Sequence, residues 1–244
     1  MTASEIKYIK QLHQKKIRET EKKFIVEGEK LVEELLLSDW KTEVVYATRE
    51  WKPATKIKSF PVKEIKESEL ERISALSAPN KVLAVVHFPS CKENIPGENN
   101  FLLLDEIKDP GNLGTIIRTA DWFGIKTVYC SENSVELFNP KTVQSSMGSV
   151  FRVKCFYVSL AEKISELKKN GTKIVGACMD GKNAVEFSFP AKAALIMGSE
   201  SHGISTKIEA FLDEKITIPG KGKAESLNVS VATGILLSLI AKEQ

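Results

Sequence analysis

Three segments in the second half of the chain each join a short apolar run to a turn rich in glycine and polar residues. They span residues 101–118, 194–203 and 216–232. In an open α/β sheet, ligands bind where the carboxyl ends of strands lead into loops and helix N-termini. We therefore expect the three turns to form one composite site for a ligand that carries anionic or hydrogen-bonding groups.

In the first segment, residues 109–112 (Asp-Pro-Gly-Asn) interrupt an apolar run and begin a helix. Helical spacing places Arg118 on the same face as Gly111 and Thr115. A guanidinium can hold a phosphate through two parallel hydrogen bonds, although an arginine here is more often a solvated surface residue. Asn112 has an equally ordinary interpretation as a helix N-cap. This segment alone supports no functional assignment.

In the second segment, a buried strand is expected to end at Gly198, and a polar turn follows to Gly203. Glycines at these positions allow close backbone approach or a positive φ. Glu200 either complements a helix dipole or orients a substrate or cofactor group. His202 has no evident partner, so we expect an ordinary loop histidine rather than a general base.

The third segment contains Pro-Gly-Lys-Gly-Lys at 219–223, followed by Ser226 and Asn228 at a helix start. It lacks the Gly-Lys-Ser/Thr of a Walker loop, and Glu225 occupies the third glycine position of a dinucleotide fingerprint. ATP hydrolysis and NAD binding are therefore disfavoured. The helix that follows is apolar on nearly all sides, which predicts burial inside the domain or across a subunit interface.

Strands and helices alternate from residue 100 onward. Strands are predicted at 101–105, 126–130, 153–157, 173–178, 193–197 and 215–218, and helices near 112–123, 140–147, 159–169, 204–212 and 227–241. This alternation predicts an α/β fold with a mostly parallel sheet and helices on both faces.

The first part of the chain predicts a smaller α/β unit. Helices are expected at 4–18, 29–37 and 67–76, and strands at 24–26, 43–47 and 82–88. A stretch with two prolines and no periodicity then indicates a linker. We predict domains at 1–89 and 100–244, joined by a linker at 90–99.

Charge and composition indicate which ligands and which cellular location to expect. The net charge is only +3, but basic residues gather near the N-terminus. Such a run is either a solvated helix face or a contact for RNA or phosphate; the candidate contacts are Lys15, Lys16, Arg18, Lys22 and Lys23. The four cysteines and three histidines are scattered without metal-ligand spacing, so no metal is expected. The polar N-terminus and the lack of a long apolar segment predict a cytoplasmic protein without membrane contact.

The three segments together carry ordered motifs: Asn112-x5-Arg118, Gly198-Ser-Glu200-x2-Gly203, and Pro219-x6-Ser226-Leu-Asn-Val-Ser-Val-Ala232. In order and position they resemble the motifs of the SpoU (TrmH-like) RNA 2′-O-ribose methyltransferases of the SPOUT superfamily. The N-terminal unit, with residues 22–28 (Lys-Lys-Phe-Ile-Val-Glu-Gly), resembles the RNA-binding substrate domain that often precedes this catalytic domain.

The resemblance implies S-adenosylmethionine as methyl donor, a ribose 2′-hydroxyl of structured RNA as acceptor, a C-terminal trefoil knot and a homodimer formed through the knot region. By motif position it implies a cofactor pocket lined by Met197, Gly198, Ile218, Gly220 and Leu227. It implies a catalytic or RNA-facing set of Asn112, Arg118, Glu200, Ser226 and Asn228.

A guanidinium has no acceptor lone pair, so we expect Arg118 to hold a phosphate and stabilise a developing alkoxide rather than act as a base. Single-domain tRNA-modifying members of the family usually lack such an N-terminal unit, so the resemblance favours ribosomal RNA as the substrate. Two alternatives remain at this point: the same chemistry on tRNA, and a catalytically silent RNA-binding protein on the same fold. The sequence leaves open which nucleotide is modified.

Overall fold

The computed structural model describes residues 1–53, 60–90 and 100–242. Its contacts divide the chain into two compact units, one formed by Met1–Lys92 with Glu136–Arg152 and the other by Glu93–Val135 with Val153–Gln244. The expected linker at 90–99 lies outside the described residues except for Ser90. Within the described residues, every helix is too short or too polar to cross a bilayer.

The first unit contains a four-stranded sheet in the order β1-β4-β2-β3, in which β4 is antiparallel to both of its neighbours and β2 pairs with β3 in parallel. Its N-terminal elements are α1 (Ala3–Gln11), α2 (Lys15–Glu21), β1 (Lys23–Glu27), α3 (Glu29–Leu37), β2 (Thr42–Ala47), β3 (Val62–Glu64), α4 (Glu67–Ile73) and β4 (Val82–His87). The predicted α3 has the observed bounds, whereas β3 was not predicted.

The single helix expected over 4–18 is wrong, because the chain turns between α1 and α2 at residues 12–14. Thr2 and Glu5 do form a capping box at the start of α1. The turn is stabilised by Arg18, whose guanidinium donates a hydrogen bond of 2.8 Å to the carbonyl of Leu12. A buried arginine thus gives the Leu12 carbonyl a hydrogen-bond donor at the break.

The segment Glu136–Arg152 completes this unit with α6 (Pro140–Ser146) and a short 3-10 helix (Ser149–Phe151). The Phe138 ring stacks on Phe24 with centroids 4.5 Å apart and lies 4.3 Å from Phe88. Phe151 meets Trp40 edge-on at 5.3 Å. By sequence the segment falls between two strands of the second unit, but its aromatic contacts are with the N-terminal residues.

The second unit is built on a six-stranded, all-parallel sheet in the order β10-β8-β9-β5-β6-β7, which confirms the predicted fold class. Its elements are β5 (Asn100–Leu104), α5 (Pro110–Trp122), β6 (Thr127–Ser131), β7 (Lys154–Val158), α7 (Leu160–Lys169), β8 (Lys173–Asn183), β9 (Ala193–Met197), α8 (Thr206–Glu209), β10 (Glu214–Thr217) and α9 (Val229–Lys242).

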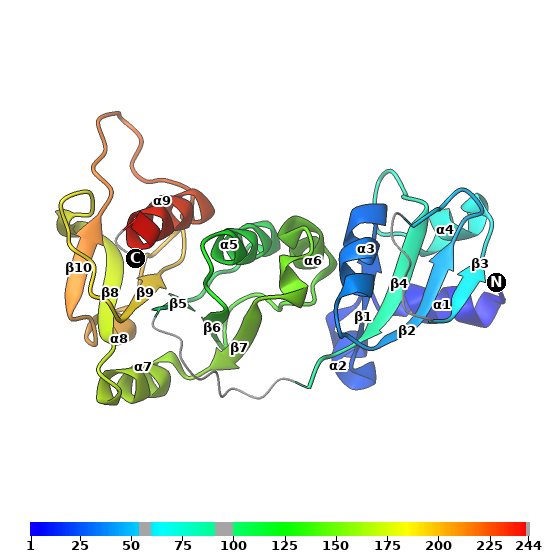
Figure 1. Ribbon diagram of the computed structural model, residues 1–244, viewed down its shortest axis with the longest axis horizontal. Coiled ribbons are helices and arrows are strands. Elements are labelled where there is room, and N and C mark those ends of the chain that lie inside the picture. Colours follow the sequence, from blue (N-terminus) through cyan, green and yellow to red (C-terminus); the bar gives the residue numbers. More distant parts are fainter. Residues whose placement is uncertain (54–59, 91–99, 243–244) are drawn as a thin grey trace. The chain divides into compact units, whose positions relative to one another are not determined.

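Helices α5 and α9 cover one face of this sheet, and α7 and α8 cover the other (Figure 1). Leu102, Leu103 and Leu104 of β5 are fully buried, as expected for a central parallel strand covered on both faces. Leu103 packs with Ile164 of α7 and Ile208 of α8. Because β5 pairs with β9, the turns that follow these two strands meet at one edge of the sheet.

Candidate active site

The turn after β5 is fixed by Asp109, the N-cap of α5. Its Oδ1 accepts the backbone N–H of Asn112 at 2.9 Å, and Pro110 occupies the first helical turn. Asp109 therefore has the capping role that we considered for Asn112, which lies one turn into the helix. The Asn112 side chain is free to reach other segments.

Asn112 joins the three motifs through its side-chain amide. Its Nδ2 donates to Oε1 of Glu200, in the turn after β9. Its Oδ1 accepts a hydrogen bond of 3.0 Å from Nδ2 of Asn228, just before α9. The structure thus brings together three of the five residues predicted for the polar set.

The Asn228 amide has an unambiguous orientation. Its Oδ1 accepts the backbone N–H of Ser230 at 2.9 Å, and a backbone N–H can only donate. Asn228 is thereby an N-cap of α9. Since its oxygen faces the helix, its Nδ2 must face Asn112, whose own Nδ2 is then left to donate to Glu200.

The turn that carries Glu200 is closed by two glycines. Ser199 and Gly203 exchange backbone hydrogen bonds of 2.9 Å in both directions, and Gly203 has a φ of +66°. A Cβ on Gly198 would lie 2.0 Å from the carbonyl carbon of Gly203. Both glycines are therefore needed for the backbone path that presents Glu200.

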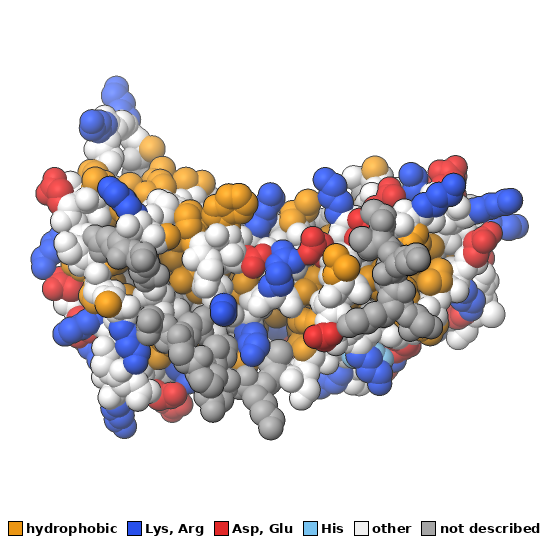
Figure 2. Space-filling view, in the orientation of Figure 1, with side chains coloured by type: hydrophobic (Ala, Val, Ile, Leu, Met, Phe, Trp, Pro, Cys, Tyr) orange, Lys and Arg blue, Asp and Glu red, His pale blue; other side chains and the backbone are white. Residues whose placement is uncertain are grey.

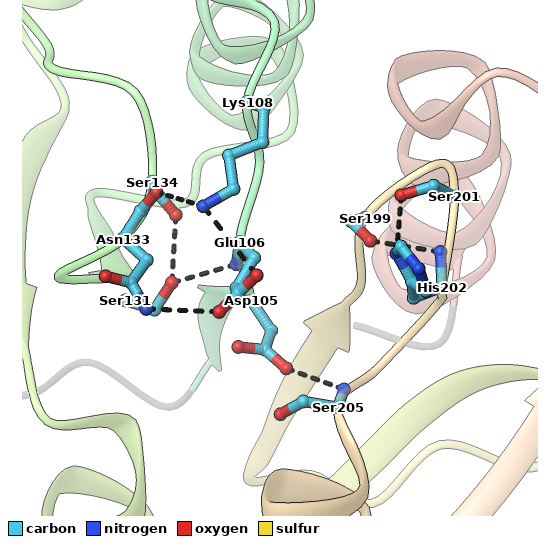
Figure 3. A network of polar contacts seen from close by, with 10 residues as sticks. All are labelled: Asp105, Glu106, Lys108, Ser131, Asn133, Ser134, Ser199, Ser201, His202 and Ser205. Carbon is cyan, nitrogen blue, oxygen red and sulfur yellow. Dashed lines mark hydrogen bonds and ion pairs between the residues drawn. The ribbon is translucent and has the colours of Figure 1, made fainter.

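Asp105 anchors the far end of this turn, and sequence reasoning missed it. The carboxylate is buried and its Oδ2 accepts the backbone N–H of Ser205 at 2.8 Å (Figure 3). The Asp105 N–H donates to the carbonyl of Met197 at 2.9 Å. Its position directly after the apolar run of β5 could have indicated a buried carboxylate with a structural role, since an acidic residue is rarely buried without partners.

The residue after Asp105 adopts a backbone conformation that is unusual for a side chain. Glu106 has a φ of +56°, and its N–H donates to Ser131 Oγ at 2.8 Å (Figure 3). Asn133 donates to its carboxylate at 3.1 Å, and Ser134 Oγ lies 3.1 Å from Ser131 Oγ. These contacts hold the strand end that leads into the first motif.

The loop between β10 and α9 is open to ligands. Over residues 218–227 it makes no backbone–backbone hydrogen bond within the described part of the chain. Lys221 and Lys223 are exposed, and Figure 2 shows basic side chains at the tip of the loop. Leu227 is 48% exposed, Ile218 is half-buried, and Ser226 forms no hydrogen bond among the described residues. This loop presents free amides beside apolar side chains.

The remaining predicted site residues lie apart from the amide chain. Arg118 is exposed on α5 and forms no hydrogen bond or ion pair with the residues that the structure describes. Met197 is buried at the end of β9, and Gly220 is exposed, with no described atom within 4 Å of a Cβ placed there. His202 is exposed, and its Nδ1 lies 2.7 Å from Ser201 Oγ (Figure 3).

One proposed RNA contact needs correction. Arg18 is only 1% exposed and pairs with Glu136, so it is a structural residue of the first unit rather than part of a solvated face. Lys23 is half-buried, and its hydrogen bond with Glu43 raises the pKa of the lysine. Lys15, Lys16 and Lys22 are exposed.

One group of metal-ligand types occurs among the described residues, formed by Cys178, Asp180 and Glu209. The Lys215 ammonium binds Asp180 at 2.9 Å and also binds Glu209. These bonds raise the pKa of Lys215, and the one to Asp180 lowers the pKa of that aspartate. Lys215 of β10 thus forms an ion-pair network with Asp180 of β8 and Glu209 of α8.

Known proteins are similar to this chain over nearly its whole length. The SpoU rRNA Methylase family model matches residues 99–238, and the MRM3-like substrate binding domain matches residues 3–84. The 23S rRNA (guanosine(2553)-2′-O)-methyltransferase RlmP of Bacillus subtilis is 34% identical over 95% of this chain and 94% of its own.

Two solved structures superpose over nearly the full length. A TrmH-family protein from Porphyromonas gingivalis is 37% identical, with a TM-score of 0.90 over 100% of this chain and 99% of its own. An AdoMet-bound rRNA methyltransferase from Sinorhizobium meliloti is 28% identical, with a TM-score of 0.87 over 99% of this chain and 95% of its own. The chain belongs to the SpoU rRNA methylase family.

Proposed function

We propose that this protein transfers the methyl group of S-adenosylmethionine to a ribose 2′-hydroxyl of ribosomal RNA. The observation that carries the proposal is the hydrogen-bonded chain Asn228–Asn112–Glu200, which links the three family motifs in one site. The full-length relatives that are named for this chemistry support it.

The residues at the strand ends fit the methyl donor. The loop over 218–227 offers unbonded backbone amides for polar groups, and Leu227 and Ile218 offer apolar surface for a purine ring. Together with Met197, Gly198 and Gly220, these residues would hold S-adenosylmethionine. When bound, it supplies an electrophilic methyl group on a sulfonium.

The polar residues would bind and orient the RNA. Arg118 is exposed and has its guanidinium available for a phosphate next to the target ribose, where it also stabilises the negative charge that develops on the 2′-oxygen. Asn112, Glu200, Asn228 and Ser226 would fix the ribose so that its oxygen is in line for transfer, and such positioning supplies a large part of the acceleration.

The N-terminal unit supports ribosomal RNA as the substrate, because residues 3–84 match a substrate-binding domain. Lys15, Lys16 and Lys22 are its exposed candidate contacts. We propose sequence domains at 1–89 and 100–244, which the two family matches support, with the segment Glu136–Arg152 of the second domain belonging to the first compact unit. A protein acting on ribosomal RNA in this way would work in the cytoplasm.

We further infer a homodimer formed through the second unit and, from membership of the SpoU family, a C-terminal trefoil knot. Trp122 of α5 is 85% exposed and Val231 of α9 is 51% exposed. Figure 2 shows apolar side chains gathered over α9. A second copy packed on this surface would remove it from water. Light scattering after size exclusion should give a dimer, and Val231→Glu should give a monomer; a monomeric unaltered protein would overturn the inference.

The function is tested by mapping 2′-O-methylation on total RNA from cells with and without the gene. We expect one ribosomal RNA position to lose its methyl group in the deletion and to regain it when the gene is restored. Loss confined to tRNA would overturn the substrate. A protein that fails to bind S-adenosylmethionine in calorimetry and leaves every RNA unchanged would be a silent RNA-binding member of the family.

A further inference from the structure

We propose that Ser230 is a positioning residue for methyl transfer, acting through Asn228. This inference rests on the proposed function and deepens it. Ser230 contacts neither Asn112 nor Glu200 in the hydrogen bonds of the described residues, but it holds the amide at the origin of the chain that joins them.

Two donors of Ser230 converge on one oxygen of Asn228. The backbone N–H donates to Asn228 Oδ1 at 2.9 Å, and the hydroxyl donates to the same atom at 2.6 Å. The Asn228 side chain is exposed, so an isolated asparagine here would rotate freely. Two donors on one side and the Asn112 acceptor on the other hold the amide plane by three bonds.

These bonds all run in one direction. Ser230 donates to Asn228, Asn228 donates to Asn112, and Asn112 donates to Glu200. Bonds that run head to tail polarise one another, so each strengthens the next. The chain ends on a carboxylate, the strongest acceptor available to it. The Ser230 hydroxyl therefore supports the orientation of every amide between α9 and the turn after β9.

The other hydroxyls of α9 do something different. Thr233 Oγ1 donates to the carbonyl of Val229 at 2.7 Å, and Ser238 Oγ donates to the carbonyl of Ile235 at 2.7 Å. Both are ordinary helix bonds to the preceding turn. Ser230 alone of the three directs its hydroxyl to a side chain of the site. Capping of α9 needs only its backbone N–H, so the hydroxyl can be removed without losing the cap.

The test is single-turnover transfer of tritiated methyl to ribosomal RNA from gene-deleted cells, for Ser230→Ala, Ser230→Thr and the control Ser238→Ala. One net hydrogen bond corresponds to about a three- to tenfold effect on rate. We expect a single-turnover rate about three- to tenfold slower for Ser230→Ala, with the affinity for S-adenosylmethionine and the midpoint of thermal unfolding unchanged. Threonine retains the hydroxyl and should restore the rate, and Ser238→Ala should match the unaltered protein.

A double-mutant cycle separates positioning from a general structural effect. In an Asn228→Ala background, Ser230→Ala should cause no further loss, because its acceptor is gone. An unchanged rate for Ser230→Ala, or an equal loss in both backgrounds, would overturn the proposal while the unaltered protein remains active. Absence of transfer by the unaltered protein would instead overturn the proposed function, and with it the positioning role of Ser230.

Discussion

Asn228 donates from its side-chain amide to Oδ1 of Asn112 across 3.0 Å, although 116 residues separate them in sequence. The bond connects the start of α9 to the first turn of α5. With the bond from Asn112 to Glu200, it converts three turns of the chain into one polar surface.

Replacing the amide donor of Asn112 by an acceptor should slow transfer strongly. Asn112→Asp places a second carboxylate against Glu200, and like charges at hydrogen-bond distance repel. We expect a loss of about a hundredfold or more in kcat, the scale of a misplaced catalytic group. The control is Asn183→Asp, because Asn183 also donates to a glutamate, Glu186, at 2.8 Å but outside the site. Equal activity of the two variants would exclude a role for the Asn112 amide.

Glycine should be required at 198 and dispensable at 222. A Cβ at Gly198 would lie 2.0 Å from backbone atoms, whereas nothing lies within 4 Å of one at Gly222. We expect Gly198→Ala to lower the free energy of unfolding by about 1 to 3 kcal/mol and to abolish binding of S-adenosylmethionine. Denaturant titration and calorimetry measure both. Normal binding by Gly198→Ala would show that the turn relaxes without consequence.

The buried pair of Arg18 and Glu136 should stabilise the first unit. Glu136→Gln leaves the Arg18 charge uncompensated in a buried position. We expect a cost of about 2 to 3 kcal/mol, somewhat below that of a fully buried pair because Glu136 is partly exposed. Glu19→Gln, which breaks the exposed pair with Lys15, should cost less than about 0.5 kcal/mol. Denaturation followed by tryptophan fluorescence compares the two variants, and similar costs would contradict the prediction.

The Cys130 thiol should be inert in the folded protein. Burial raises its pKa from the ordinary 9.0 to about 12. Iodoacetamide at pH 8, read by peptide mass spectrometry, should label Cys130 only after denaturation, since the thiolate is the reactive form.

The same shift has a consequence for stability. The folded protein keeps this proton at pH values where the unfolded chain loses it, so stability is fully present below about pH 9 and falls as the pH rises towards about 12. Cys130→Ala should flatten this part of the stability profile. An unchanged slope would mean that the thiol does not contribute to it.

The sequence predicts local features better than long-range ones. Periodicity and apolar runs located α3, the six strands of the parallel sheet and the three turns at their ends. The break between α1 and α2 could not be predicted, because residues 12–14 contain neither glycine nor proline and the turn depends on the Arg18 side chain. The prediction that Arg18 lies on the surface is wrong because its partner, Glu136, is 118 residues away in sequence.

The candidate site shows the same division. The resemblance grouped Asn112, Glu200 and Asn228. The motif also contains Ser230, but only the folded chain shows that its backbone N–H fixes the direction of each hydrogen bond. The role of Asp105 could not be predicted from the sequence, because its hydrogen-bond partner is the backbone N–H of Ser205, 100 residues further on.

The aromatic contacts of Phe138 and Phe151 limit how this protein can be divided by evolution or by engineering. The two family matches suggest interchangeable modules, yet the residues that complete the N-terminal core are encoded inside the catalytic match. A truncation beginning at Asn100 would carry Phe138 and Phe151 without the rings of Phe24 and Trp40. Exchange of the substrate-binding domain between relatives would therefore require that residues 136–152 be exchanged with it.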